Sequence, residues 1–508
     1  MSKKGAQFLA DCGRRFTRRV VNESQAALGL NWSFRVLFQS KGFPIRNPRN
    51  HCPSQFLVLS SAPFIVTLMR SLFVRQVNQR SSDRDRQTEL IRCPVHGFIH
   101  YSPNERVIID HPVFQRLRNV RQLALTHYVY PGATHSRFEH SLGVMEMATR
   151  AIDSVGLKNQ KLVVSELRAV PGLKKDTWKR ARQTLRLFAL LHDVGHPAFS
   201  HAAEEVIPGG DHEDISRHVV EKVLGPKLRE LFFESVVDLL VRLFKKSPET
   251  TFLRGFVAGE MDMDRTDYLL RDSLHCGVEY GRFDFRRLIE SLTVYKSRDT
   301  GRIELALERG GEHTFEALIL ARYQMNTQVY YHRLRRIYDY YLTQYMKLWA
   351  PFHYKTPDDV LRFDDIKVLA EIFKDAKTKN PRSKWAQRIT DRRHHKVVYE
   401  TGDNADLIQL KRVKRILETV RRKFKSTDFY LDDKANSIHK LTVHGQQDES
   451  RVDFFLVEKD GTPRLITEQS AVLEKIPAAF RSVRIYADAG PERLKEIKEA
   501  ARNAEKEI

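Results

Sequence analysis

Apolar residues recur at helical spacing through the middle of the chain. Residues 111–125 place Phe114, Leu117 and Leu123 at this spacing, with Pro112 near the first turn, where proline is tolerated. The same pattern predicts further helices over residues 137–152, 184–196, 213–225, 263–275 and 314–349. We therefore expect the middle of the chain to form a helix-rich domain.

The pattern changes after about residue 350, where helices and strands are expected to mix. Residues 451–468 predict two strands about an Asp460-Gly461 turn, and residues 482–490 predict another strand. Residues 412–424 are expected to be helical, as is the charged amphipathic stretch 491–508. The predicted fold class is mainly α, a helical core with a smaller α+β C-terminal domain. We expect three segments: a basic, poorly ordered extension over 1–86, a helical domain over 87–349 and the α+β domain over 350–508.

The extension over residues 1–86 shows no sustained helical or strand period. It holds 15 Lys and Arg against 4 Asp and Glu, so half of the chain's net charge of +22 lies there. Its uncharged stretch 56–69 is interrupted by Pro63 and is shorter than the roughly 20 residues of a membrane span. It does not begin at the N-terminus, as a signal peptide would. We therefore expect no membrane partner.

The composition is that of an ordinary soluble protein, with 41% hydrophobic and 30% charged residues among 508. The four cysteines are scattered and form no CxxC pair; they are Cys12, Cys52, Cys93 and Cys276. This spacing argues against a disulfide scaffold or a thiolate zinc site and fits a reducing cytoplasm. The modestly basic body beyond residue 86 is compatible with anionic nucleotides and with nonspecific nucleic-acid contact.

One apolar stretch carries unexpected polar residues. LLHDVGHPAFSH, residues 190–201, continues the apolar run before it yet holds His192 and Asp193. Burying a carboxylate among apolar side chains costs several kcal/mol unless something pairs with it. On the expected helix these two neighbours project about 100° apart, and both still reach one point off that face. A shared metal ion explains the pair.

Further ligands must come from elsewhere in the chain. RFEHS places His140 on a predicted helix, and MDMDRTDYLLRD supplies Asp264, whereas Asp262 and Asp267 point mostly to other faces of that helix. Two imidazoles and two carboxylates make a mixed nitrogen and oxygen site. Such a site suits Mn²⁺, Fe²⁺, Zn²⁺ or Mg²⁺, so a divalent metal is the predicted cofactor.

Five motifs occur in order from about residue 88 to 345: FQRLRNVRQL, RFEHSLGV, LLHDVGHPAFSH, HE and MDMDRTDYLLRD. Together they resemble the HD-domain deoxynucleoside triphosphate triphosphohydrolases, a family that includes bacterial dGTPases and the vertebrate sterile-alpha-motif/HD-domain dNTPase. The likeness weakens towards residue 400, and no sterile-alpha-motif domain is recognisable in residues 1–86. The resemblance implies a helical HD-domain phosphohydrolase core that hydrolyses dNTPs, dGTP foremost, to deoxynucleoside and inorganic triphosphate.

The resemblance also implies a role for each matching residue. The metal-ligand positions are those of His140, His192, Asp193 and Asp264. The catalytic and triphosphate-facing group comprises His196, His201, His212 and Glu213. Substrate contacts fall on Gln122, Leu123, Arg137, Arg265, Tyr268 and Asp272. Three of these, Gln122, Leu123 and Asp272, match positions that hold the deoxyribose.

These implied roles agree with the chemistry of attack at the α-phosphorus. A metal lowers the pKa of bound water and polarises a phosphoryl oxygen, and arginines hold triphosphate oxygens. We expect His201, oriented through His212 and Glu213, to give the leaving 5′-oxygen its proton. Crowding of the sugar by Tyr268 and Gln122 would reject a 2′-hydroxyl.

Members of the family are often oligomers with nucleotide-filled regulatory sites at subunit contacts. The resemblance places the contacts of such a site at Asp110, Gln115 and Arg118, with Arg392 and Lys396 from another subunit. Cys93 stands where some relatives carry Asp, so part of that pocket departs from the family pattern. We expect a cytoplasmic homo-oligomer, a dimer or tetramer, with dGTP as the candidate activator.

Two other functions stay open at this point. One is another HD phosphohydrolase that acts on cyclic nucleotides, nucleoside monophosphates or guanosine tetraphosphate, although His196, His201 and Arg137 favour a triphosphate. The other is a nucleic-acid-binding or scaffold protein with a secondary HD site, which the net charge supports. Intact ligands speak against an inactive enzyme, because packing alone would not demand all four.

Overall fold

The computed structural model describes residues 88–298, 300–442 and 452–507. The predicted extension over residues 1–86 lies outside the described residues, together with its uncharged stretch 56–69. Within the described ranges, no helix is both long enough and apolar enough to span a bilayer.

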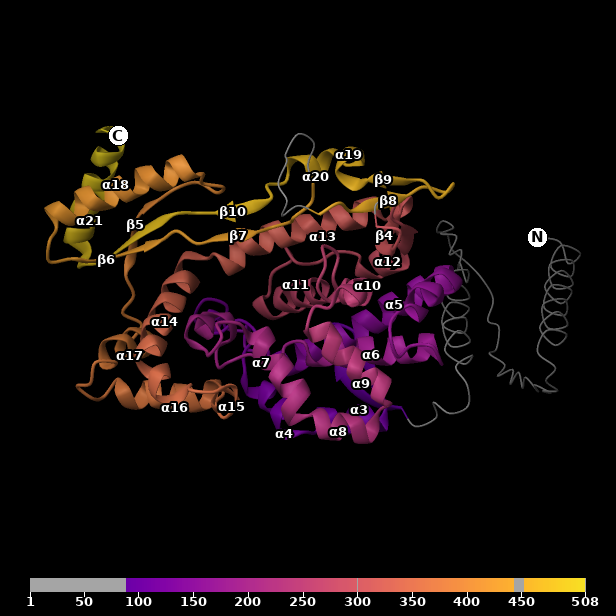
Figure 1. Ribbon diagram of the computed structural model, residues 1–508. Coiled ribbons are helices and arrows are strands. Elements are labelled where there is room, and N and C mark those ends of the chain that lie inside the picture. The colour runs from indigo at the N-terminus through magenta and orange to yellow at the C-terminus, as the bar shows by residue number, and fades with distance from the viewer. Residues whose placement is uncertain (1–87, 299, 443–451, 508) are drawn as a thin grey trace, which may run out of the picture. The chain divides into compact units, whose positions relative to one another are not determined.

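Two long helices form the centre of the helical part (Figure 1). α5 (Arg137–Arg168) begins where Glu139 accepts the backbone N–H of Ser136 over 3.0 Å. α6 (Thr177–Leu191) packs along α5, and their facing apolar side chains lie in one buried core. α9 (Glu234–Phe244) packs against α6, and α11 (Met263–Cys276) packs against α5.

Shorter elements complete this part. The helices are α3 (Pro103–Ile109), α4 (Pro112–Gln115), α7 (His212–His218), α8 (Gly225–Leu231), α10 (Thr251–Arg254) and α12 (Phe285–Glu290). The 3-10 and π turns are η1 (Arg116–Asn119), η2 (Thr126–Tyr128), η3 (Ser200–Val206), η4 (Val219–Val223), η5 (Pro248–Thr250) and η6 (Arg309–Gly311).

The single helix expected over residues 111–125 is wrong. α4 ends at Gln115, η1 follows, and Val120 is extended, with φ −110° and ψ 109°. The extended backbone is tied to the start of α5, because Arg137 donates its N–H to the carbonyl of Val120 over 2.8 Å. Gln122 and Leu123 therefore lie on irregular chain rather than on a helix.

The long helix expected over residues 314–349 is divided. α13 (Glu312–Met325) leads through the π-helical turn η7 (Asn326–Tyr330) into α14 (Arg333–His353). The domain boundary predicted at residue 349 falls inside α14 and stays a prediction. After α14 come α15 (Pro357–Leu361), α16 (Asp365–Asp375) and α17 (Ser383–Thr390).

Small sheets hold the strands. β1 (Glu89–Cys93) and β2 (Gly97–Tyr101) form an antiparallel hairpin. A second sheet has the order β3 (Leu292–Lys296), β4 (Ile303–Glu308), β8 (Phe455–Val457) and β9 (Pro463–Leu465). β8 and β9 confirm the two strands predicted on either side of Asp460 and Gly461. β7 (Ala435–Ser437) pairs with β10 (Ala479–Arg481).

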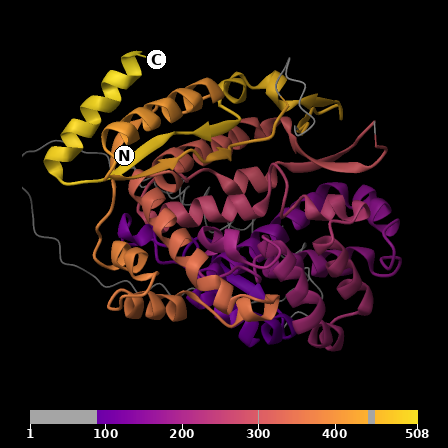
Figure 2. The same cartoon turned by 60° about the vertical axis from the view of Figure 1, so that its left-hand side comes forward.

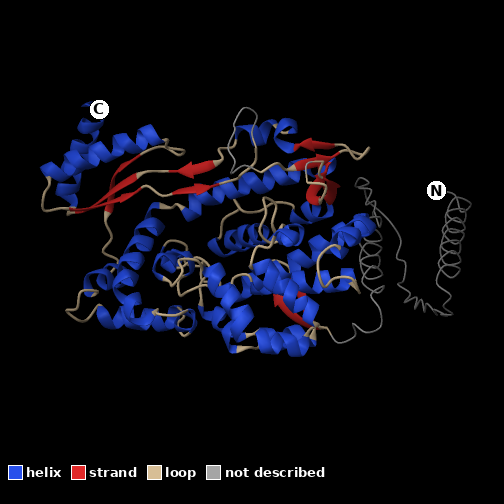
Figure 3. Cartoon of the chain, in the orientation of Figure 1, coloured by secondary structure: helices blue, strands red, loops and turns tan. Residues whose placement is uncertain are grey.

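The remaining sheet is antiparallel, in the order β5 (Lys396–Glu400), β11 (Arg484–Asp488) and β6 (Asp428–Asp432). α18 (Leu407–Lys423) and α21 (Pro491–Glu507) pack against each other and against this sheet, as the orange and yellow helices of Figure 2 show. Two short helices, α19 (Ile466–Gln469) and α20 (Ala471–Lys475), follow β9. Helices dominate, and the strands lie mostly in the C-terminal part (Figure 3), so the mainly α fold class is confirmed.

Candidate metal centre and adjoining cleft

His140 is buried one turn into α5, and its ring is held from one side. Nδ1 lies 2.8 Å from Oδ2 of Asp267, which is on α11 and accepts this proton as a carboxylate. Asp267 also accepts Nε of Arg271 at 2.8 Å and lies 2.5 Å from Nε2 of His96. With Nδ1 protonated, the lone pair of His140 Nε2 faces the opposite way, towards Asp193 and Asp264.

His192 lies just past the end of α6 rather than within a helix. α6 stops at Leu191, so the helix expected through residue 196 is wrong over its last turn. Gly195 allows the chain after His192 to lie close to α7, because a Cβ there would lie 2.3 Å from the backbone nitrogen of Ser216. Nδ1 of His192 donates to the carbonyl of Ala189 over 2.7 Å, which leaves Nε2 as the free ring nitrogen.

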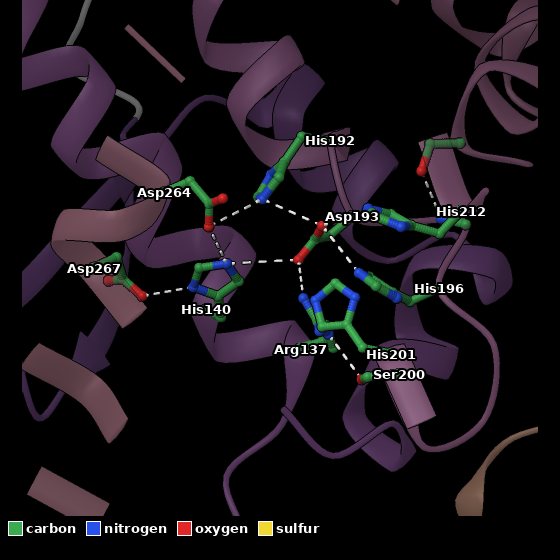
Figure 4. A network of polar contacts seen from close by, with 12 residues as sticks. Arg137, His140, His192, Asp193, His196, Ser200, His201, His212, Asp264 and Asp267 are labelled. Atoms are coloured by element: carbon green, nitrogen blue, oxygen red, sulfur yellow. Dashed lines mark hydrogen bonds and ion pairs between the residues drawn. The ribbon is translucent and has the colours of Figure 1, made fainter. Parts of the chain in front are cut away.

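The four predicted ligands converge from α5, the α6–η3 connection and α11 (Figure 4). Nε2 of His192 is 3.4 Å from Oδ1 of Asp193 and 3.7 Å from Oδ1 of Asp264, and Nε2 of His140 is 3.0 Å from the same Asp264 oxygen. Both Nε2 atoms are buried, and neither forms a hydrogen bond within the described residues. Buried imidazole nitrogens that face carboxylates without forming a hydrogen bond are the donor set of a divalent metal site, so these residues fit one.

The electrostatics of the cluster favour a cation. Burial opposes protonation of His140, yet the carboxylates of Asp264 and Asp267 raise its pKa to about 10. Burial likewise opposes ionisation of Asp193, but Arg137 and the neighbouring histidines hold the pKa of that carboxyl well below its usual range. The same negative field that attracts a proton to His140 attracts a metal ion.

Arg137 joins the cluster to the adjoining cleft. Its guanidinium donates to Oδ2 of Asp193, and its Nε donates to Oγ of Ser200 over 2.9 Å. Arg137 therefore makes one contact at each end of the loop that carries His192 and His201, and these two contacts fix its position.

A second group of polar residues lies beside Asp193. The His196 and His212 rings stack at 3.7 Å, and Nε2 of His196 is 3.4 Å from Oδ1 of Asp193. Glu204 on η3 accepts from Nδ1 of His212 and, over 2.9 Å, from Nδ1 of His201. The expected orientation of these histidines through Glu213 is wrong: Glu213 instead pairs with Lys246 at 2.8 Å.

The cleft consists of two cavities that meet. The first, of about 210 Å³, is lined among others by His192, Asp193, Asp264, His212, Glu213 and Arg254. The second, of about 380 Å³, is lined among others by Leu123, Asp272, Arg322, Tyr330, Arg335 and Arg336. Gln122, Arg137, His201 and Tyr268 line both cavities. His196, fully buried behind Asp193, lines neither.

The positions predicted to contact substrate mostly face this cleft. Asp272 is held by Nε2 of His135 and by the hydroxyl of Tyr330, each at 2.7 Å. Arg265 is the exception: it lines neither cavity and turns its guanidinium towards the carbonyl of Gly259 and the carboxylate of Asp262. Arg254 and Arg322, which sequence reasoning missed, supply cations to the two cavities instead.

The five predicted regulatory positions lie away from the cleft. Gln115 donates to the carbonyl of Ile109 and accepts Nε of Arg118, whose guanidinium stacks 3.6 Å over the Phe138 ring. Asp110 is an exposed partner of Arg106. On other elements, Arg392 lies near the ring of Tyr128, and Nζ of Lys396 is 2.9 Å from Nε2 of His394. Their nucleotide-binding role stays a prediction.

Two residues that sequence reasoning passed over complete the site. Asp267 was assigned to another face of α11, and it does point away from the cleft, but that face meets His140. Glu204 carries a usable signal, because it follows His201 by three residues and so shares its side of a helical turn. Arg254 and Arg322 carry no comparable signal, since both come from separate helices.

Comparison with known proteins places these residues in a family. Residues 137–272 match the HD domain, and residues 283–428 match the HD associated region. An uncharacterised protein of Methanocaldococcus jannaschii is 36% identical over 251 residues, which is 49% of this chain and 48% of that protein. The deoxynucleoside triphosphate triphosphohydrolase SAMHD1 of Homo sapiens is 29% identical over 294 residues, 50% of this chain and 44% of that protein.

A solved structure extends the likeness. A hypothetical protein from Aquifex aeolicus aligns with a TM-score of 0.64 and 27% identity, covering 82% of this chain and all of that one. The chain spans about half the length of the curated relatives named above. The predicted resemblance to HD-domain deoxynucleoside triphosphate triphosphohydrolases is confirmed. The chain therefore carries an HD domain followed by an HD-associated region.

Proposed function

We propose that this protein is a metal-dependent triphosphohydrolase that converts dNTPs, dGTP foremost, to deoxynucleoside and inorganic triphosphate. The observation that carries the proposal is the convergence of the buried Nε2 atoms of His140 and His192, neither in a hydrogen bond, on two carboxylates at the wall of a cleft that contains arginines. The similarity to SAMHD1 supports the substrate class.

His140, His192, Asp193 and Asp264 would hold the divalent metal. When bound, such an ion activates water and neutralises phosphoryl charge. The ligand set contains no thiolate, which is compatible with Mn²⁺, Fe²⁺, Zn²⁺ or Mg²⁺.

The cleft offers separate surroundings for the two ends of a nucleotide. Arg137 and Arg254 line the cavity beside the metal ligands, where they would hold triphosphate oxygens. Tyr268, Tyr330 and Asp272 line the second cavity, where they would enclose the sugar. A cyclic nucleotide or a monophosphate would leave the arginines of the first cavity without phosphate partners, so a triphosphate is the better fit.

His201 is placed to complete the reaction. Hydrolysis joins a water oxygen to the α-phosphorus and breaks the bond from that phosphorus to the 5′-oxygen, which must then gain a proton. His201 lines both cavities, and its Nδ1 is held by Glu204, so the Nε2 proton is free to reach the leaving oxygen.

Product analysis tests the proposal. The purified protein is incubated with each of the four dNTPs, with Mn²⁺ and with chelator, in the presence and absence of dGTP. We expect deoxynucleoside and intact triphosphate in a one-to-one ratio, with no pyrophosphate or monophosphate. Absence of turnover of every dNTP under every metal would contradict the proposal. Turnover of cyclic nucleotides, nucleoside monophosphates or guanosine tetraphosphate would then favour another HD phosphohydrolase.

Glu204 gives a prediction about pH dependence. Burial lowers the pKa of His212, but the hydrogen bond to Glu204 outweighs this and raises it. Glu204 links His212 to His201, the proposed proton donor. In Glu204→Gln this link loses its negative charge, so the alkaline limb of kcat/KM is expected to move to lower pH by roughly one unit. We also expect kcat/KM to fall about 10²-fold. Glu205→Gln is the matched control, because Glu205 pairs with Lys347 and Lys434 on the neighbouring surface and should leave the profile unchanged.

The other expected partners stay predictions. These are activation by dGTP, assembly into a homo-oligomer, a cytoplasmic location and nonspecific nucleic-acid contact. For the last, binding that falls with salt and survives removal of the metal would favour the scaffold function.

A further inference from the structure

The connection between α15 and α16 reaches the loop that carries the site. Asp365, the first residue of α16, is 2% exposed. Its Oδ1 accepts the backbone N–H of Phe199 over 2.7 Å, and its Oδ2 accepts that of Arg121 over 3.0 Å. Asp365 belongs to the HD-associated region, whereas Phe199 belongs to the HD domain. One carboxylate therefore fixes two chain segments of the cleft from behind.

The backbone that Asp365 holds is strained. Phe199 and Ser200 have φ values of 62° and 54°, in the left-handed region that bulky residues rarely adopt. Such backbone persists only where its surroundings impose it, and it clusters at functional sites. Oγ of Ser200 donates to the carbonyl of Arg121 over 2.8 Å and accepts from Nε of Arg137. The left-handed pair thus sets the position of the arginine that contacts Asp193.

Arg116 reaches the same loop at its other end. Its guanidinium donates to the carbonyls of Val194 at 3.1 Å and His196 at 2.7 Å, and a third N–H reaches the carbonyl of Phe363 at 3.0 Å. Val194 and His196 follow Asp193 directly, and Phe363 lies in the α15–α16 connection. Arg116 therefore fastens the turn after Asp193 to the HD-associated region.

Neither charge is explained by packing. Arg116 and Asp365 are both buried, and among the described residues neither forms an ion pair. Burial raises the pKa of the Asp365 carboxyl to about 7. Their hydrogen bonds go to backbone groups instead: Arg116 bonds Val194, His196 and Phe363, and Asp365 bonds Phe199 and Arg121. A buried charge left without a charged partner is costly, and apolar side chains of similar size would fill the same space. What these two residues supply is a defined position for the backbone of residues 194–199.

We propose that Arg116 and Asp365 are positioning residues, a brace through which the HD-associated region holds the loop bearing His192, Asp193 and His201 in the geometry that binds metal. The inference rests on the proposed metal site and deepens it, because it assigns a role to a region outside the HD domain.

Cobalt binding tests the brace without substrate. Co²⁺ is titrated into metal-free protein, and its visible absorption, which reports the arrangement of its ligands, is recorded for wild type, Asp365→Asn and Arg116→Lys. Asparagine keeps the size of Asp365 but turns an N–H donor towards one of the two amides. We expect the apparent Kd for Co²⁺ to rise at least about tenfold in both variants, with a changed spectrum. With substrate, kcat is expected to fall about 10²-fold.

Asp391→Asn is the matched control. Asp391 also belongs to the HD-associated region, but it is exposed and pairs with Arg393 at 3.5 Å, away from Arg116 and Asp365. We expect it to bind Co²⁺ as wild type does. Arg116→Lys keeps the positive charge. If Asp365→Asn does not fold, the Co²⁺ affinity and spectrum of Arg116→Lys test the brace.

The outcomes separate the brace from the proposed function. Wild-type affinity and spectrum in a folded brace variant would overturn the brace. Tight Co²⁺ binding by the wild type, weakened in both variants, would support the brace even if no dNTP were hydrolysed, in which case only the proposed substrate would fail.

Discussion

Replacing Asp193 with asparagine is expected to abolish hydrolysis of every dNTP and to release most of the bound metal. Asp193 is the point at which the two polar groups of the site meet, because its oxygens face His192, His196 and Arg137. An amide keeps the shape of the side chain but removes the charge that offsets a cation. We expect kcat/KM to fall about 10³-fold or more.

Metal content measured by mass spectrometry and product analysis under the same conditions check this expectation. Asp153→Asn is the control, since Asp153 is also an aspartate of the HD domain but pairs with Arg182 at a partly exposed position. Circular dichroism establishes that both variants are folded. A folded Asp193→Asn protein that kept a tenth of the wild-type rate with full metal content would exclude Asp193 as a ligand.

The second large effect is expected at Asp267, a residue that faces away from the cleft. Asp267 is fully buried and pairs with Arg271 at 2.8 Å while holding His140 and His96. Removing one member of a buried charge pair leaves the other without compensation. Asp267→Asn is therefore expected to lower the free energy of unfolding by about 3 kcal/mol and the metal affinity by about 10- to 100-fold.

The loss is expected to depend on pH. Burial opposes ionisation of Asp267, but Arg271 and the hydrogen bonds of His140 and His96 hold its pKa well below the ordinary value of 3.8. A carboxyl with a depressed folded-state pKa stabilises the fold above the unfolded-state pKa and loses this contribution as the pH falls through the folded-state pKa. Wild type and Asp267→Asn should therefore differ most near neutrality and converge in strong acid.

Urea unfolding at several pH values measures this difference. Glu279→Gln is the matched control, because it removes an exposed partner of Arg282, and a surface ion pair contributes about 0–1 kcal/mol. Equal unfolding free energies of Asp267→Asn and wild type at pH 7 would show that the buried network does not stabilise the fold.

Local patterns in the sequence were enough to predict most of the elements and to select the four candidate metal ligands. The helical periods around His140 and Asp264 correspond to α5 and α11, and the Asp460-Gly461 turn joins β8 to β9. These succeed because hydrophobic period and turn chemistry are properties of neighbouring residues. His192 and Asp193 could be identified for a similar reason, because a charged side chain within an apolar stretch needs a partner whatever the fold.

Other features depended on contacts between distant segments. The expected helix over 111–125 breaks at Val120 because that backbone pairs with the start of α5, a constraint that no local period carries. Arg265 shares α11 with the candidate ligand Asp264, yet its guanidinium bonds the carbonyl of Gly259, and Arg254 and Arg322 line the cleft instead.

The amino-acid sequence was enough to predict the mainly α class, the five ordered motifs and the four residues that face the candidate metal position. Contacts in the folded protein were needed to show that Asp267 bonds His140, that Glu204 rather than Glu213 joins His201 to His212, and that Arg116 and Asp365 bond the backbone of residues 194–199. The physical reason is the range of the interactions. A helical period, or a charge within an apolar stretch, can be recognised from residues that are close together in the sequence. The hydrogen-bond partners of Arg116 and Asp365, in contrast, lie about 80 to 250 residues away along the chain.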